Sequence, residues 1–99
     1  MASRVAAQAE ADLDEIWLYV AMESGNLEVA TRLVESVTSR FSFLAGFPRA
    51  GRTRDRDLGM GIRSFAAGEY LIIYCVDGED VLILRVIHAK RELGDLFAR

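Results

Sequence analysis

The stretch of residues 68–91 constrains the fold more than any other part of this chain, because it holds two apolar runs with a turn between them. Residues 70–76 and 81–87 are rich in β-branched and aromatic side chains, which are typical of strands. Between them, Asp77-Gly78 supplies the positive φ that a tight turn needs. The sequence therefore predicts a β-hairpin at the centre of the fold.

Side chains alternate along a strand, so the predicted hairpin has two faces. With Tyr74 opposite Ile83 and Ile72 opposite Arg85, one face is entirely apolar and consists of Leu71, Ile73, Cys75, Leu82, Leu84 and Val86. The other face adds two phenols and a guanidinium to its aliphatic groups and consists of Tyr70, Ile72, Tyr74, Val81, Ile83, Arg85 and Ile87. We expect the first face to form the core, with Cys75 acting as a small apolar group, and the second to lie open to a partner.

Two helical patterns precede the hairpin. From residue 7, apolar side chains recur at spacings of three and four, on Ala9, Leu13, Ile16, Trp17 and Val20. Gly25 then serves as a helix stop, and Asn26 as the N-cap of a second helix over residues 27–47. The apolar stripe of that helix consists of Leu27, Ala30, Val34, Val37, Phe41 and Leu44, and is widened by Val29, Leu33, Phe43 and Phe47. Because the break is short, we expect the helices to pack antiparallel.

The first helix also carries an acidic cluster, which consists of Glu10, Asp12, Asp14 and Glu15. Negative charge near a helix N-terminus complements the helix dipole. We expect these residues to form a solvated face, since the cluster contains no histidine that would favour a metal site.

The remaining segments complete an α+β domain. Residues 2–6 predict a weak edge strand, residues 49–60 an exposed loop, and residues 61–66 a strand beside the hairpin. After the hairpin, helical spacing predicts a short C-terminal helical turn with Leu93, Leu96 and Phe97. The predicted architecture is an N-terminal helical hairpin packed on one face of a small antiparallel sheet, in one domain over residues 1–99.

Composition excludes several classes of protein. A single cysteine rules out an internal disulfide, and no apolar run approaches the roughly 18 residues of a membrane span. The N-terminus lacks the pattern of a signal peptide, so we expect a cytoplasmic location without membrane contact. There is no glycine-rich phosphate loop, no Cys/His set at metal spacing and no nucleophile elbow, so we expect no metal and no cofactor.

Charge is distributed unevenly along the chain. Residues 1–47 hold three arginines against seven acids, whereas residues 48–99 hold nine basic residues against eight acids. Basic residues crowd the segment 49–56 and follow the last strand at Lys90 and Arg91. The net charge of −3 does not suggest a nucleic-acid binder, so we expect no direct sequence-specific contact with nucleic acid.

Three kinds of residue are candidates for function. His88 is the single histidine, and it could move a proton in phosphodiester cleavage or simply end the strand and bond to the backbone. Tyr70 and Tyr74 could stack on bases or on a partner, or serve only as strand formers. Arg85 lies in the middle of a central strand, where its charge needs a carboxylate, which another protein could supply.

The ordered set of short segments resembles the ParE toxins of the RelE/ParE superfamily of bacterial toxin–antitoxin systems. The segments are AEADLDEIWLYVA, FPRAGR, GIRSF and EYLIIYCVDGEDVLILRVIHAKREL, and they span nearly the whole chain. The most specific pieces are the Asp12-Leu13-x-x-Ile16-Trp17 segment, the Pro48-x-x-Gly51-Arg52 turn, Gly61-Ile62-Arg63, and the Arg85-Val86-Ile87-His88-x-x-Arg91 ending.

The resemblance implies a function that composition does not show. ParE toxins typically poison DNA gyrase and are held inactive by a ParD-like antitoxin whose C-terminal segment wraps the toxin. RelE relatives instead cleave mRNA on the ribosome with basic residues and Tyr, Glu or His. The tail GDLFAR ends without a Tyr or His, so that catalytic set is incomplete here.

Two main hypotheses follow. In the first, the chain is a gyrase-directed toxin without catalysis, and its target and antitoxin contacts are Arg63, Tyr70, Tyr74, Arg85, His88, Lys90 and Arg91, with the loop 49–56 second. In the second, it is a ribosome-dependent endoribonuclease whose catalytic residues are Arg63, Arg85, His88 and Arg91. A member that has lost toxicity and persists as an antitoxin partner is a third reading.

Overall fold

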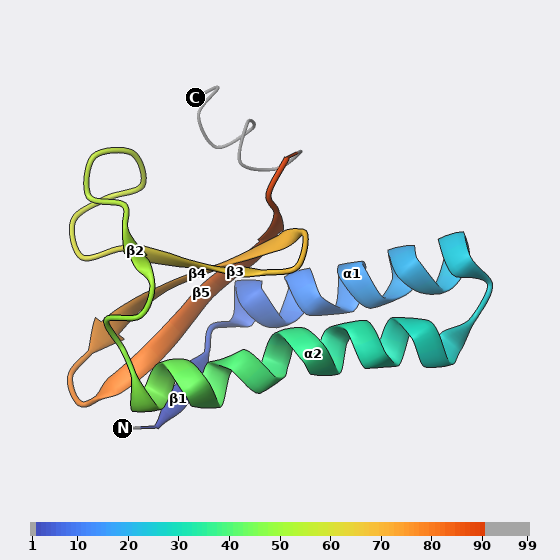
Figure 1. The fold of residues 1–99 in the computed structure, drawn as a ribbon, viewed down its shortest axis with the longest axis horizontal. Coiled ribbons are helices and arrows are strands. Elements are labelled where there is room, and N and C mark those ends of the chain that lie inside the picture. Colours follow the sequence, from blue (N-terminus) through green and yellow to red (C-terminus); the bar gives the residue numbers. More distant parts are fainter. Residues whose placement is uncertain (1, 91–99) are drawn as a thin grey trace.

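The sheet is built from both ends of the chain, with a helical hairpin inserted after its first strand. The computed structural model describes residues 2–90. The elements in chain order are β1 (Ser3–Val5), α1 (Ala7–Ser24), α2 (Leu27–Gly46), β2 (Arg52–Thr53), β3 (Arg63–Ala67), β4 (Tyr70–Asp77) and β5 (Asp80–His88). Figure 1 shows the two helices lying side by side along one face of the sheet. The predicted α+β architecture is confirmed.

The strand order is β1-β5-β4-β3-β2. Strands β2 to β5 form the predicted antiparallel meander, whereas β1 pairs with β5 in parallel, so the sheet is mixed. Strand β1 is short, and it ends at Val5, where the chain turns into α1. Beyond Ile83, the outer edge of β5 therefore has no strand beside it.

The break between the helices is formed as predicted. Gly25 adopts a φ of 66° at the end of α1, and its N–H donates to the carbonyl of Ala21. The Asn26 side-chain oxygen then accepts the N–H groups of Glu28 and Val29, at 2.9 and 3.3 Å. This N-cap satisfies two of the backbone donors that the first turn of a helix leaves unpaired.

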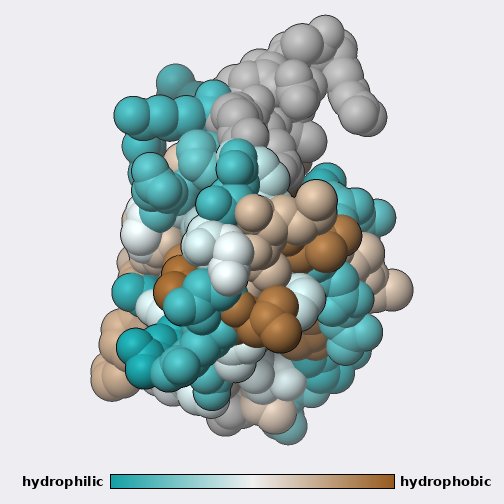
Figure 2. Space-filling model, turned by 90° about the vertical axis from the view of Figure 1, so that its right-hand side faces the viewer, coloured by the Kyte–Doolittle hydropathy of each residue, from teal (hydrophilic) through white to brown (hydrophobic). Residues whose placement is uncertain are grey.

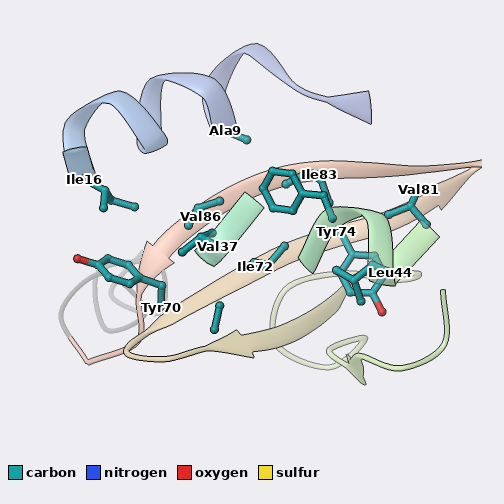
Figure 3. Packing of buried hydrophobic residues seen from close by; sticks show 12 residues of the cluster. Ala9, Ile16, Val37, Leu44, Tyr70, Ile72, Tyr74, Val81, Ile83 and Val86 are labelled. Carbon is teal, nitrogen blue, oxygen red and sulfur yellow. The ribbon is translucent and has the colours of Figure 1, made fainter. Parts of the chain in front are cut away.

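The prediction of which sheet face forms the core is wrong. Tyr70, Tyr74 and Ile72 point toward the helices, where they are at most 7% exposed, and Figure 3 shows the Tyr74 ring beside Leu44 of α2. A large phenol buries much apolar area at little cost when its hydroxyl finds partners, as the Tyr74 hydroxyl does. Both faces were apolar enough to be covered, so alternation alone did not decide between them.

A β-bulge also changes the predicted register. The pairing shifts between Ile73 and Tyr74, which leaves Leu84 as the extra residue on β5. Ile72 therefore lies opposite Val86 rather than Arg85, and Val86 joins the core. After the bulge, the residues of β5 are displaced by one position relative to β4. The strict alternation of side chains between the two faces therefore holds only up to Ile83.

The aliphatic face of the hairpin lies on the side of the sheet away from the helices. Ile73 is 5% exposed there, and the half-buried residues of this face include Leu71, Cys75, Leu82 and Leu84. Cys75 was predicted to lie in the core, but it is on the opposite face of the sheet and only half-buried. Partial burial and the nearby Asp77 carboxylate raise the pKa of its thiol.

The helical hairpin extends beyond the sheet and exposes apolar side chains at its far end. Leu18, Met22, Leu27 and Val29 are 44 to 76% exposed, and the space-filling view of that end shows brown and tan residues at the surface (Figure 2). Leu27, the first residue of α2, was predicted to be on the buried stripe but is 64% exposed, because that end of the helical hairpin lies beyond the sheet (Figure 1). Neither described helix has a stretch apolar enough to cross a membrane. The predicted C-terminal turn and Arg91 lie outside the described residues.

Candidate partner-binding surfaces

The Arg85 guanidinium is neutralised within the domain by Asp12 of α1. Its Nε and Nη2 donate to the two oxygens of the Asp12 carboxylate, at 2.8 and 3.2 Å. Asp12 also accepts the backbone N–H of Val86 at 2.9 Å, and it is 5% exposed. Arg85 thus has the carboxylate that its position was expected to need, but Asp12 of the same chain supplies it rather than another protein. The prediction that Asp12 lies on a solvated face is wrong.

The position of Asp12 follows from the early end of β1. Ala6 still donates its N–H to the carbonyl of Ile83, but the chain then leaves the sheet edge to start α1. The next outward N–H of β5, on Val86, would be left without a strand partner. The Asp12 carboxylate takes that place, because a helix that starts beside the edge brings its second turn over it.

Tyr70 and His88 lie next to each other at the end of the β4–β5 pair. Their rings meet edge to face with centroids 5.4 Å apart, and the Tyr70 side chain is 7% exposed. The Nδ1 atom of His88 accepts the backbone N–H of Lys90 at 3.3 Å. Both residues line a cleft of about 270 Å³ between α1 and the strand ends, whose walls also include Asp12, Glu15, Ile16, Tyr19 and Val86. Within residues 2–90, no group of His, Cys, Asp and Glu could hold a metal ion.

Arg63 lies at a different place on the sheet. It faces Tyr74 across β3 and β4, whereas His88 faces Tyr70, so the two are separated by four residues of β4. At about 3.3 Å per residue, this corresponds to about 13 Å along the strand. The three described members of the ribonuclease set, Arg63, Arg85 and His88, are therefore not brought together into one site.

Arg63 and Tyr74 instead hold the segment that follows α2. The Arg63 guanidinium donates to the carbonyl of Gly51 at 2.8 Å. The Tyr74 hydroxyl donates to the carbonyl of Pro48 and accepts the N–H of Gly51, both at 2.8 Å. Burial raises the pKa of Tyr74. Gly51 is packed so tightly against this ring that an added Cβ would lie 2.4 Å from its hydroxyl oxygen.

The loop between β2 and β3 is partly folded around a buried arginine, where the sequence predicted an exposed loop. The Arg54 guanidinium bonds to the Asp57 carboxylate, at 2.7 Å from Nη2, and to the Ser64 hydroxyl at 2.9 Å. This contact lowers the pKa of Asp57. Three other arginines of the predicted basic segment, Arg49, Arg52 and Arg56, are exposed and form no ion pair with any residue from 2 to 90.

A surface that the sequence reasoning missed lies at the end of α2. Phe43 and Phe47 were assigned to the buried stripe, yet they are 44% and 62% exposed. They line a groove of about 520 Å³ together with Gly46, Pro48, Arg49 and Ala50. The available signal was a pair of phenylalanines one helical turn apart, directly before a proline that ends the helix.

Solved structures with a similar fold come from toxin–antitoxin systems. A chain of the chromosomal ParDE toxin–antitoxin system from P. aeruginosa superposes with a TM-score of 0.80 at 23% identity, over 91% of this chain and 97% of that one. A chain of the RelBE2 toxin–antitoxin complex from Mycobacterium tuberculosis gives a TM-score of 0.59 at 27% identity, over 88% and 95% of the two chains. The helical hairpin on a five-stranded sheet is therefore the fold of the RelE/ParE-like toxins.

Sequence comparison narrows the class to one family. Residues 4–93 match the family described as the ParE toxin of the type II toxin–antitoxin system parDE. The chain is 37% identical to Toxin ParE3 of Caulobacter vibrioides over 84% of its length and 81% of that protein. It is 34% identical to Toxin ParE1 of the same organism, over 92% and 96% of the two chains. The chain belongs to the ParE toxin family of type II toxin–antitoxin systems.

Proposed function

We propose that this chain acts on DNA gyrase as a binding protein without catalysis of its own, and that a ParD-like antitoxin in the bacterial cytoplasm neutralises it. The observation that carries the choice of a binding protein is the dispersal of the ribonuclease set over the sheet. Arg85 is bound to Asp12, Arg63 to the carbonyl of Gly51, and His88 lies at the far end of β5. General acid–base catalysis needs such groups within reach of one reacting phosphate.

The exposed basic residues are the best candidates for the target contact. Arg52 and Arg56 have no ion-pair partner within the described chain, so forming a new contact costs them no existing pair. Lys90 is exposed at the other end of the sheet. Arginine suits such a role, because its planar guanidinium binds carboxylates and phosphates through two parallel hydrogen bonds.

The antitoxin proposal follows from the family and from the solved neighbours. The structurally similar chains come from a ParDE system and from a RelBE2 toxin–antitoxin complex. This chain also exposes large apolar side chains at the end of α2, where Phe43 and Phe47 are 44% and 62% exposed. Exposed apolar surface of this kind marks sites of protein–protein contact.

A supercoiling assay tests the proposal directly. The purified chain is added to gyrase, relaxed plasmid and ATP, and both supercoiling and trapped linear DNA are measured. We expect loss of supercoiling, accumulation of cleaved DNA, and reversal of both by the antitoxin. Unchanged supercoiling at a large molar excess of the chain would refute the gyrase target.

A His88→Ala variant separates this function from ribosome-dependent mRNA cleavage. A gyrase-binding toxin need not lose its toxicity, because the contacts of His88 within the chain are structural: its ring packs edge to face on Tyr70, and its Nδ1 accepts the N–H of Lys90. A ribonuclease should lose most of its activity, because general acid–base catalysis contributes about 10²–10⁴-fold. Cleavage of ribosome-bound mRNA by the wild-type chain, lost in the variant, would establish the ribonuclease instead.

A further inference from the structure

The groove at the end of α2 is an aromatic surface open to solvent. The Phe43 ring contacts the Phe47 ring with centroids 5.1 Å apart, and it contacts Phe65 of β3 at 5.5 Å. Phe43 thus connects the exposed surface to the sheet, while Phe47 is 62% exposed. Side chains of this size contribute much of the binding energy where proteins meet.

The groove is held in shape before any partner arrives. Its wall at Pro48 is fixed by the hydrogen bond from the Tyr74 hydroxyl, and that hydroxyl also accepts the N–H of Gly51. The Arg63 guanidinium bonds to the carbonyl of Gly51 from the other side. A preformed surface loses little conformational entropy when it binds, which favours tight association.

Among the described residues that line the groove, the single charged one is basic, although the whole chain has a net charge of −3. No acidic residue occurs in the sequence between Glu35 and Asp55, whereas four arginines do. One of them, Arg49, lines the groove and is exposed. Charge complementarity therefore favours an occupant that is itself acidic.

We propose that the antitoxin docks an apolar anchor side chain against Phe43 and Phe47, with a carboxylate beside it that pairs with Arg49. This inference rests on the proposed function. The antitoxin is favoured over the target because interfaces of long-lived complexes are more apolar than those of transient ones. The walls of this groove are mainly apolar, and are formed by the rings of Phe43, Phe47 and Pro48 and by Gly46.

The test compares three variants for binding to the ParD-like antitoxin that restores growth when it is co-expressed with this chain. Phe47→Ser removes the exposed ring, and Arg49→Glu reverses the charge. Met22→Ser is the matched control, since Met22 is 76% exposed at the opposite end of the helical hairpin. Phe47 is preferred to Phe43, which also packs on Phe65 and contributes to folding.

We expect Phe47→Ser to weaken antitoxin binding on the order of 30-fold, as for a hot-spot side chain, and Met22→Ser to change it less than about threefold. Arg49→Glu should weaken binding too, by a factor that falls as salt is raised. Isothermal titration at two salt concentrations measures all three, and thermal melting confirms that each variant is folded.

Two results would overturn the inference while leaving the proposed function intact: equal affinity of Phe47→Ser and wild type for the antitoxin, or an equal loss in Met22→Ser. Loss of gyrase inhibition or of duplex-DNA binding in Phe47→Ser, at unchanged antitoxin affinity, would assign the groove to the target or to DNA and overturn it as well. A wild-type chain that does not bind the antitoxin would refute the proposed partner itself.

Discussion

Two arginine-containing regions of this toxin differ in how their charge is balanced. At the seam between α1 and β5, Arg85 is bound through two nitrogens to a carboxylate that is 5% exposed. At the end of α2, the exposed Arg49 has no ion-pair partner among residues 2–90. The first arginine bonds to a residue 73 positions earlier in the sequence, and the second lies beside an open aromatic groove.

The difference separates an arginine that stabilises the fold from one whose charge is open to a partner. Asp12 serves β5 both as a counter-ion and as a backbone acceptor, so its removal would take an acceptor from both the Arg85 guanidinium and the Val86 N–H. Arg49 can be changed without leaving any described group unsatisfied, so its contribution must come from a partner. A variant at the seam should therefore lose stability, whereas a variant at the groove should lose binding.

The largest expected effect on stability is at the seam. Asp12→Ala removes the buried carboxylate that accepts from the Arg85 guanidinium and the Val86 N–H, at a cost of about 3 kcal/mol in the free energy of unfolding. Urea denaturation measures the loss. Asp14→Ala, at an exposed acid of the same helix, is the control and should stay within about 0.5 kcal/mol of wild type. Similar losses in both variants would show that the seam is not special.

The next effect tests the packing that holds the loop after α2. In Gly51→Ala the new methyl group would meet the Tyr74 hydroxyl at 2.4 Å and the Ser64 carbonyl at 2.9 Å. We expect a loss of about 1–3 kcal/mol, since a packed site must shift to admit the methyl group. Gly46→Ala, where nothing lies within 4 Å, should be neutral or slightly stabilising. The comparison fails if both alanine variants melt together.

Tyr74→Phe tests the same loop through its hydrogen bonds. The variant leaves the Gly51 N–H without its acceptor and the Pro48 carbonyl without its donor, at a cost of about 1–2 kcal/mol. It should also change the alkaline behaviour. Burial raises the pKa of Tyr74 above its usual 10.0, so its stabilising contribution is complete below that pH and is lost as pH rises through the folded-state pKa.

Urea titrations between pH 9 and pH 11 measure that dependence. The wild type should lose stability over this range more steeply than Tyr74→Phe, because the variant has no phenol to ionise. Parallel curves for the two chains would show that another group causes the alkaline loss.

The smallest expected effect is at the exposed ion pairs of β1. Arg4 bonds to Asp77 at 2.6 Å and to Asp80 at 3.1 Å, but its side chain is half exposed. Contacts of this kind contribute little and are screened by salt. Arg4→Ala should therefore lower the melting temperature less than Asp12→Ala, Gly51→Ala or Tyr74→Phe does, and the difference should vanish at high salt. A large, salt-independent drop would show that β1 depends on this side chain.

Part of the structure could be predicted because its signals are local. The end of α1 at Gly25 and the cap at Asn26 depend only on residues within one turn of the helix. The hairpin turn at Gly78, with a φ of 65°, depends on the same kind of information. These features follow from local backbone preferences, which the tertiary contacts of this fold do not override.

The predictions that failed concern choices between equivalent alternatives. Two apolar faces of one hairpin compete for the same core, and the bulge at Leu84 depends on how β5 meets its neighbour. The partner of Arg85 is found 73 positions earlier in the chain, so no spacing in the sequence predicts it. The exposed end of α2 likewise depends on where the sheet stops covering the helices.

The sequence by itself thus determined the order and type of the elements, the helical hairpin, the central β-hairpin and the membership of the ParE family, since each rests on local patterns or on ordered motifs. Only the tertiary structure decided which sheet face is buried, that Asp12 neutralises Arg85, and that Phe43 and Phe47 remain at the surface. The physical reason is that burial and charge pairing depend on which segments meet in space. Hydrophobic pattern and secondary-structure propensity describe each segment alone, whereas a core or an ion pair forms between two segments.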